Sequence, residues 1–242
     1  MKAQALQDRM LSALMPELHA RLPRHGLSET AGPESGAPGK WQQRKSALMR
    51  DRLVGAAIDC LVRDGYPGLT TAAVASACDV SRGAMHHHFQ TRMELVCAVV
   101  DHVVYHRMRT FLADYFDVAS RRTDEPMIEL ACDAHWRSVQ TRDYAAWLEL
   151  AVAARTDADL ATIFEPAARR YDAVWTSEMI EAFPQWREDW DNLKLAHDFT
   201  SALHAGMLLH QPIFASQERI DRLRRFAART MQQLSEQTSS RP

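Results

Sequence analysis

Residues 70–89, TTAAVASACDVSRGAMHHHF, constrain the fold more than any other stretch of the chain. Their pattern predicts a helix, a tight turn and a second short helix. In the first helix, Val74, Ala75 and Cys78 share one apolar face. Asp79 falls at the turn, where a residue that tolerates positive φ is needed. Ser81 suits the N-cap of the second helix, because its hydroxyl can accept a hydrogen bond from a free backbone N–H.

The second helix is predicted to turn Met85 and Phe89 toward the core. Five small or polar residues then face outward: Arg82, Gly83, Ala84, His86 and His87. Two helices joined at a steep angle by a short turn form a helix-turn-helix, whose second helix enters the major groove of DNA. Small residues permit close approach, and Arg and His supply donors. The alternative interpretation is a helical hairpin inside a plain bundle.

Short sequence elements on both sides of this stretch, between about residues 44 and 100, extend the pattern. They are Ala56-Ala57, Asp64-Gly65-Tyr66, Thr70-Thr71, Val74-Ala75, Val80-Ser81-x-Gly83, His88-Phe89, and Arg92 with Glu94-Leu95. With them, the segment resembles the TetR family of transcriptional regulators. Three positions depart from the family pattern: Asp79 replaces a Gly, His86 a Tyr and Arg92 a Lys.

The resemblance implies an all-α fold, with an N-terminal three-helix DNA-binding domain and a C-terminal helical domain for ligand binding and dimerisation. It implies a ligand-responsive repressor that binds a palindromic operator as a homodimer and leaves it when a small, largely apolar molecule binds. Phosphate contacts are expected from Lys45, Thr70, Thr71, His86 and Arg92, and base contacts from Arg82, Gly83, Ala84 and His87. A cation at the start of a helix opposes the helix dipole, which favours a phosphate contact for Arg92 over a stabilising role.

The charge distribution agrees with a DNA-facing end and a separate body. Residues 40–95 carry 8 basic and 5 acidic residues, a net charge of +3. Residues 96–242 carry 17 basic and 22 acidic residues, a net charge of −5. A basic segment attracts nucleic acid, and an acidic body stays away from its phosphates. The difference is small and serves as supporting evidence.

Three domains are expected: an extension at 1–40, the helix-turn-helix domain at 41–95 and the body at 96–242. Within the extension, residues 3–22 look helical, and residues 23–40 are rich in Pro, Gly and Ser and predict a linker. The extension could dock a partner, form a mobile arm or reflect the choice of start codon. Residues 41–64 predict the first helix, with a basic cluster of Lys40, Arg44, Lys45 and Arg50 that could contact phosphate or simply face solvent.

A long helix is expected at 91–115, capped by Thr91, followed by body helices at 126–140, 143–155, 157–182, 186–210 and 216–237. Proline residues should kink or separate them. Aromatic residues could line an effector pocket or fill a plain core: Phe111, Trp136, Trp147, Phe164, Tyr171 and Trp175. Apolar faces on the last two helices match the family's dimer interface: Phe199, Leu203, Met207, Leu223 and Phe226. Burial within one chain is the alternative for these faces.

The sequence shows no catalytic, metal or cofactor motif, so we expect neither an enzyme nor a bound cofactor. The three adjacent histidines at 86–88 point in different directions on a helix and cannot share one ion. His102 and His106 lie four residues apart, with no acidic or Cys partner at a fitting spacing beside them. The four cysteines are expected to be buried free thiols in a reducing cytoplasm, with a redox sensor as the alternative. No apolar run is long enough to cross a membrane. A helical carrier of acyl or lipid-like ligands with a vestigial DNA domain, and a histidine-using metalloenzyme, are the competing functions.

Overall fold

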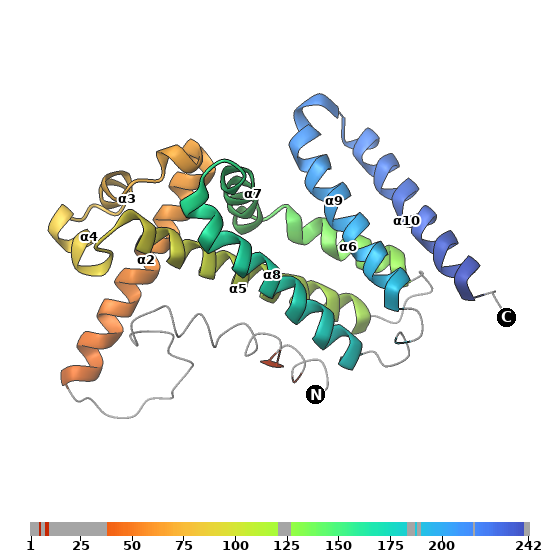
Figure 1. Ribbon diagram of the computed structural model, residues 1–242, viewed down its shortest axis with the longest axis horizontal. Coiled ribbons are helices and arrows are strands. Elements are labelled where there is room, and N and C mark those ends of the chain that lie inside the picture. The colour runs from red at the N-terminus through yellow and green to blue at the C-terminus, as the bar shows by residue number, and fades with distance from the viewer. Residues whose placement is uncertain are drawn as a thin grey trace. The chain divides into compact units, whose positions relative to one another are not determined.

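Every regular element in the described part of the chain is a helix, as the sequence predicts. The computed structural model describes Ala5, Asp8 and Arg9, residues 38–120 and 127–182, Arg187, and residues 190–214 and 216–239. The helices are α2 (Pro38–Gly68), α3 (Thr71–Ala77), α4 (Arg82–His88), α5 (Arg92–Ser120), α6 (Met127–Val139), α7 (Arg142–Ala154), α8 (Ala158–Ala182), α9 (Trp190–Phe214) and α10 (Gln217–Ser239) (Figure 1). Most of the predicted N-terminal extension lies outside the described residues.

The chain divides into two compact units. The first, here called the motif unit, spans residues 14–105 and 145–169, and the second, the body unit, spans residues 1–13, 106–144 and 170–242. The long helices α5 and α8 each contribute to both units. The motif unit therefore contains α7 from residue 145 onward and the first half of α8 in addition to the helix-turn-helix. The boundaries at 40/41 and 95/96 remain predictions.

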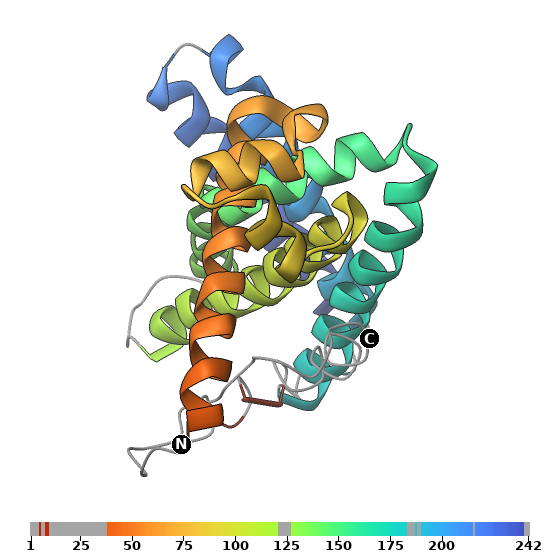
Figure 2. The same ribbon diagram turned by 90° about the vertical axis from the view of Figure 1, so that its left-hand side faces the viewer.

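The core of the motif unit begins at Leu53 and is built from apolar residues at helical spacing. Leu53, Ala57 and Leu61 on α2 are fully buried, as are Leu95 and Val99 on α5. Helix α2 packs on α3, and α3 packs on α4; Figures 1 and 2 show α3 and α4 beside the middle and end of α2. This core fixes the two short helices, which could not persist alone.

Two boundaries of α2 depart from expectation. The helix begins at Pro38, so residues 38–40 are helical rather than part of the predicted linker. Proline fits the first turn of a helix, because its missing N–H would have no partner there. At the other end, Gly65 adopts φ 70° and ψ 178°, which interrupts the helix at the expected turn.

In the body unit, α9 and α10 pack against each other and both contact α6. Helix α9 continues to Phe214, with Pro212 inside its last turn, so the predicted end at residue 210 is too early. Pro166 likewise lies inside α8 without ending it. None of the four cysteines forms a disulfide; Cys60 and Cys78 are buried as expected, whereas Cys97 and Cys132 are half-buried. Among the described residues, no helix combines the length and apolar content needed to cross a bilayer.

Candidate DNA-binding site

Local hydrogen bonds define the two helices of the motif. The Thr70 hydroxyl accepts from the Ala73 N–H at 3.1 Å at the start of α3, and the Ser81 hydroxyl accepts from the Ala84 N–H at 3.1 Å at the start of α4. Both side chains thus act as N-caps. Between the helices, Asp79 has φ 52°, which confirms that the turn needs a residue tolerant of the left-handed region.

Helix α4 has one face in the core and one in solvent. Met85 and Phe89 are 1% and 0% exposed. The five residues predicted to face outward are all exposed: Arg82, Gly83, Ala84, His86 and His87. A Cβ added to Gly83 would meet only the Ser81 hydroxyl at 3.8 Å, so the fold itself does not require glycine there. Its lack of a side chain leaves the outer face of α4 open to a closely approaching ligand.

Two arginines of α2 tie the ends of the short helices to the core. Arg52 Nη2 donates to the Cys78 carbonyl at 2.7 Å, just after α3, and Arg50 Nη1 donates to the His88 carbonyl at 2.9 Å, at the end of α4. The Arg50 guanidinium also lies 4.1 Å from the Phe89 ring centroid. Carbonyls at a helix end have no partner within the helix, and these cations satisfy them. Arg50 therefore supports α4 from within, a role that sequence spacing alone did not indicate.

Arg92 uses its guanidinium for hydrogen bonds within the protein, and its expected phosphate contact stays a prediction. Its Nε donates to the Leu69 carbonyl at 2.6 Å, and its Nη2 and Nη1 donate to the Tyr66 carbonyl and hydroxyl at 2.8 and 3.1 Å. Its guanidinium also stacks 4.2 Å from the Tyr66 ring centroid. Burial raises the pKa of Tyr66, and the Arg92 cation opposes that rise. Arg92 thus joins α5 to the segment between α2 and α3.

Thr71, His86 and Lys45, the remaining predicted phosphate ligands, are half-buried or exposed. Thr71 is the first residue of α3 and is half-buried, while His86 is exposed on α4. Lys45 is exposed on α2, with its Nζ 5.3 Å from the Trp41 ring centroid. The neighbouring His88 is half-buried, and burial lowers its pKa, which favours the neutral ring. The surface thus has charged donors at its edges and a neutral ring at the end of α4.

Comparison with known proteins agrees with this geometry. Residues 53–99 match the sequence profile of the family described as "Bacterial regulatory proteins, tetR family". The helix-turn-helix domain belongs to the TetR family. An uncharacterized HTH-type transcriptional regulator of Mycobacterium tuberculosis is 29% identical over 149 residues, or 60% of this chain and 74% of that protein. The HTH-type transcriptional regulator CymR of Pseudomonas putida is 30% identical over 119 residues, or 48% of this chain and 56% of that protein.

Solved structures share the fold beyond the TetR-family domain. A transcriptional regulator from Rhodococcus sp. Rha1 matches with a TM-score of 0.57 at 21% identity, over 76% of this chain and 96% of that one. The multidrug binding protein EbrR, solved with imidazole, matches with a TM-score of 0.56 at 16% identity, over 76% and 93% of the two chains. The fold is therefore that of TetR-family regulators. The transcriptional regulators among its relatives in sequence support the assignment of the chain as a DNA-binding regulator.

The residues predicted to line a TetR-type effector pocket fall into both units. Trp147 and Phe164 pack together in the motif unit, with ring centroids 4.5 Å apart. In the body unit, Trp175 stacks on His197 at 3.7 Å, and the Trp136 ring meets His204 at 5.2 Å. Phe111 is 7% exposed, and Tyr171 lies 4.6 Å from the Arg107 guanidinium. Their role in effector binding remains a prediction.

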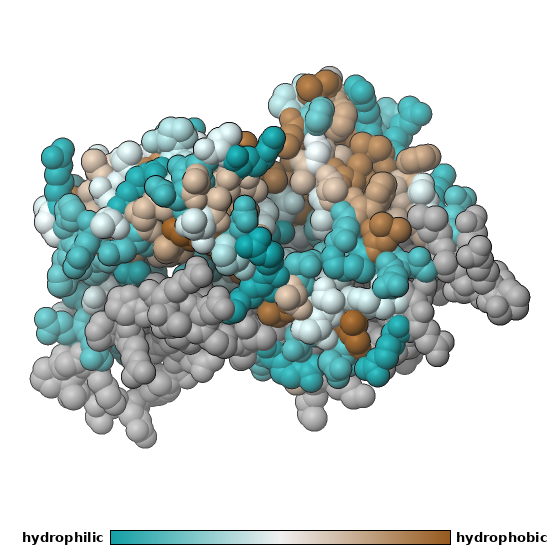
Figure 3. All heavy atoms as spheres, in the orientation of Figure 1, coloured by the Kyte–Doolittle hydropathy of each residue, from teal (hydrophilic) through white to brown (hydrophobic). Residues whose placement is uncertain are grey.

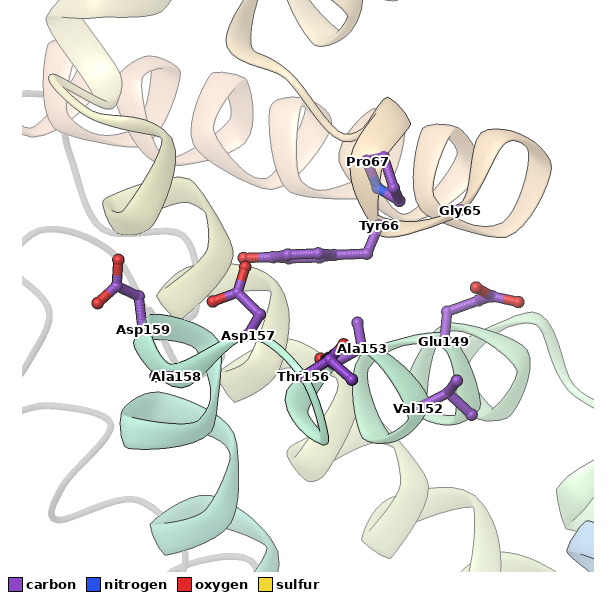
Figure 4. Close-up of a pocket in the computed structure, with 10 residues that line it drawn as sticks. All are labelled: Gly65, Tyr66, Pro67, Glu149, Val152, Ala153, Thr156, Asp157, Ala158 and Asp159. Atoms are coloured by element: carbon purple, nitrogen blue, oxygen red, sulfur yellow. Dashed lines mark hydrogen bonds between the residues drawn. The ribbon is translucent and has the colours of Figure 1, made fainter.

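A hollow of roughly 610 Å³ lies within the motif unit, and none of the predicted effector residues lines it. Figure 4 shows its walls, the α2 turn with Tyr66 and Pro67 on one side and the α7–α8 corner on the other. Glu149, Asp157 and Asp159 give the lining its charge, and no Lys or Arg contributes to it. The Asp157 carboxylate accepts from the Leu160 N–H at 2.8 Å, so it caps α8.

The predicted dimer residues differ in exposure. Phe199 and Phe226 are 45% and 68% exposed, whereas Met207 is 1% exposed. Met207 therefore belongs to the core of the body unit. Its prediction as a dimer residue was wrong, because helical spacing alone does not tell which face of α9 is buried. Leu203 and Leu223 are intermediate. Further exposed apolar side chains extend the surface, namely Leu195, Leu209 and Ile213, and Figure 3 shows apolar atoms gathered over α9 and α10.

His106 has an acidic neighbour that sequence spacing did not reveal. The His106 Nδ1 lies 3.8 Å from the Asp143 carboxylate, which is contributed by α7. Arg109 on α5 also lies 3.0 Å from the same ring nitrogen. The expectation that no acidic group stands beside this histidine was wrong, because the fold brings in a residue 37 positions away.

Proposed function

We propose that this protein is a homodimeric repressor that binds a palindromic operator and is released by a small, largely apolar effector. The outer face of α4 carries the proposal: five exposed small or polar residues supported from below by the buried Met85 and Phe89. A short helix held this way can enter the major groove. Arg82 has the donor geometry for the O6 and N7 atoms of guanine. Thr71 and His86 would hold phosphate.

The exposed apolar surface of α9 and α10 supports the dimer. Five large apolar side chains are between 45% and 68% exposed there: Leu195, Phe199, Leu209, Ile213 and Phe226. Exposed apolar side chains gathered on two neighbouring helices are typical of a protein interface. Two copies related by a twofold axis would present two α4 helices to half-sites roughly one helical turn apart, or a multiple of it, which requires a palindrome.

The proposed effector is a small, largely apolar molecule. The aromatic side chains buried in both units support a largely apolar ligand. The structural neighbour EbrR is named a multidrug binding protein, which supports ligand binding in a protein of this fold. An effector releases DNA if it binds better to a conformation whose α4 helices no longer match the operator spacing. Such a repressor would act in the cytoplasm, with residues 41–95 binding DNA and residues 96–242 binding the effector and the second subunit.

Selection of duplexes from a random pool, at two salt concentrations, tests the proposal. A palindromic consensus and an affinity that falls steeply with salt are the expected results. The repressor proposal fails if no sequence is enriched at either salt concentration, both with and without cell extract as a source of co-ligand. In that case copurified acyl chains, identified by mass spectrometry, would support the competing carrier function.

A further inference from the structure

The first three turns of α2, residues 38–49, stand outside the packed part of the motif unit. None of the described side chains from Trp41 to Arg50 is buried, and the core starts only at Leu53. Trp41 and Leu48 are 68% and 69% exposed. Figures 1 and 2 both show this part of α2 projecting past α3 and α4. The side chains from Trp41 to Lys45 are all exposed, so they gain little from packing and are accessible to a partner.

The charge of this segment identifies the partner. Residues 38–50 contain Lys40, Arg44, Lys45 and Arg50 and no acidic residue. The side chains of Arg44 and Lys45 are exposed, and Lys45 lies over the Trp41 ring. The N-terminal end of a helix adds further positive potential, and no acidic residue of the first turn offsets it. Cations beside a flat aromatic ring fit a nucleic-acid backbone, which offers phosphates and apolar sugar edges.

The contacts of Arg50 fix where this segment lies relative to the recognition helix. Its hydrogen bond to His88 places residue 50 at the C-terminal end of α4. Lys45 and Trp41 lie about 8 and 14 Å from residue 50 along the helix, at 1.5 Å per residue. Those lengths correspond to up to about four base pairs of duplex at 3.4 Å each.

We propose that the start of α2, through Arg44, Lys45 and Trp41, binds the backbone of the DNA adjoining the base pairs that α4 contacts. Each subunit thereby protects up to about four more base pairs than its helix-turn-helix alone. The contact adds affinity without sequence preference, because it engages phosphates. This inference rests on the proposed function, since it requires operator binding by α4.

The test compares wild type with R44Q/K45Q on the selected operator. The matched control is R63Q/R169Q, which removes two exposed cations from the same unit at positions far from this segment in sequence. The expected result is a hydroxyl-radical footprint that is shorter by up to about four base pairs at each half-site in R44Q/K45Q alone. The slope of log affinity against log salt should also become shallower by about 1 for each phosphate that the variant no longer binds.

Two further measurements keep the outcomes distinct. Thermal unfolding of R44Q/K45Q should equal that of wild type, because neither side chain is packed, and the charge-conserving R44K/K45R should restore the footprint. Equal footprints and salt slopes in wild type and R44Q/K45Q would overturn the inference while leaving the repressor intact. Equal losses in the control would also overturn it, because the effect would then be one of net charge. Failure of wild type to select any operator would instead overturn the proposed function.

Discussion

The α3–α4 pair and the α9–α10 pair handle their apolar residues in opposite ways. In α3 and α4 the large apolar side chains, such as Met85 and Phe89, are buried beneath a polar or small-residue surface. In α9 and α10 the core residues Met207 and Ile220 are buried, but Phe199, Ile213 and Phe226 remain exposed. The large apolar side chains of the first pair are covered within one chain, and its surface suits a polar partner. The second pair leaves large apolar side chains in solvent, which favours burial against another apolar surface.

The largest expected effect is loss of the packing beneath α4. Phe89→Ala should destabilise the protein by about 3–5 kcal/mol, because a fully buried aromatic ring leaves a cavity when removed. Chemical denaturation followed by circular dichroism measures this change. Phe226→Ala is the matched control, since its ring is 68% exposed. A similar loss of stability in monomeric protein for both variants would contradict the contrast between the two pairs.

An ionised side chain in the exposed α9–α10 surface should separate the subunits. Phe226→Asp is expected to weaken dimerisation by roughly 2–4 kcal/mol, because a carboxylate would have to be desolvated at the interface. Analytical ultracentrifugation over a concentration series gives the dissociation constant. Arg222→Asp, an exposed position one turn earlier on α10, controls for added negative charge. An unchanged dissociation constant for Phe226→Asp would place the dimer interface elsewhere.

Removal of Arg92 should damage the motif unit rather than a phosphate contact. Arg92→Ala leaves the carbonyls of Tyr66 and Leu69 without these hydrogen bonds, at an expected cost of about 1–3 kcal/mol. Thermal unfolding should show this loss, while the salt slope of DNA binding should match wild type. An unchanged melting temperature combined with a slope shallower by about 1 would instead restore the phosphate role expected from the sequence.

Arg82→Ala tests whether the exposed face of α4 contacts bases. The variant should keep wild-type stability, since Arg82 is exposed, but lose about 1–3 kcal/mol of discrimination at the base pair it contacts. Competition between consensus and single-substituted duplexes measures that discrimination. Equal loss of affinity for specific and random duplexes would show that Arg82 binds phosphate.

The helix-turn-helix was predictable because its signals are local. N-caps, a turn residue and the spacing of Met85 and Phe89 all act within a few positions. Arg50 and Arg92 show where such reasoning ends. Their acceptors lie 38 and 23–26 residues away, so only the fold decides whether each guanidinium faces DNA or the protein. In the basic cluster near residue 45, Arg50 is half-buried and holds the end of α4, whereas Arg44 and Lys45 are exposed. Composition alone cannot separate these two roles.

The body was less predictable, because helical periodicity locates a helix but not the partner of each face. Met207 and Phe199 share α9 and both fit a dimer seam by spacing, yet only Phe199 is substantially exposed. The same limit applies to histidines. His135 and His204 come together across 69 residues, with their Nδ1 atoms 2.8 Å apart, and no local pattern indicated this pair.

That histidine cluster, His135, His197 and His204, should give the two units different responses to acid. Burial lowers the pKa of His197 and of His204 to about 4, and it lowers that of His135 well below 6.5. In the unfolded chain these rings bind protons near pH 6.5, so the unfolded state gains protons first as pH falls. Stability contributed by the neutral rings is therefore complete above about pH 6.5 and declines as pH falls from there toward 4. The charged groups around the cluster do not cancel this direction: Arg107, Lys194 and Arg224 also lower these pKa values, while Asp172 and Asp198 only partly oppose them at His197.

Between pH 7 and 6 the expected loss is about 0.7 kcal/mol for each ring, or roughly 2 kcal/mol for the three, which lowers the melting temperature by several degrees. Hydrogen exchange should report the loss in the body unit, around α6 and α9, and much less in α3 and α4, where only the half-buried His88 has a lowered pKa. His204→Gln, which keeps a hydrogen-bonding side chain that does not titrate, should flatten the profile. If exchange in α4 rose with acid as much as in α9, the buried histidines would not be the cause, and the two units would unfold as one.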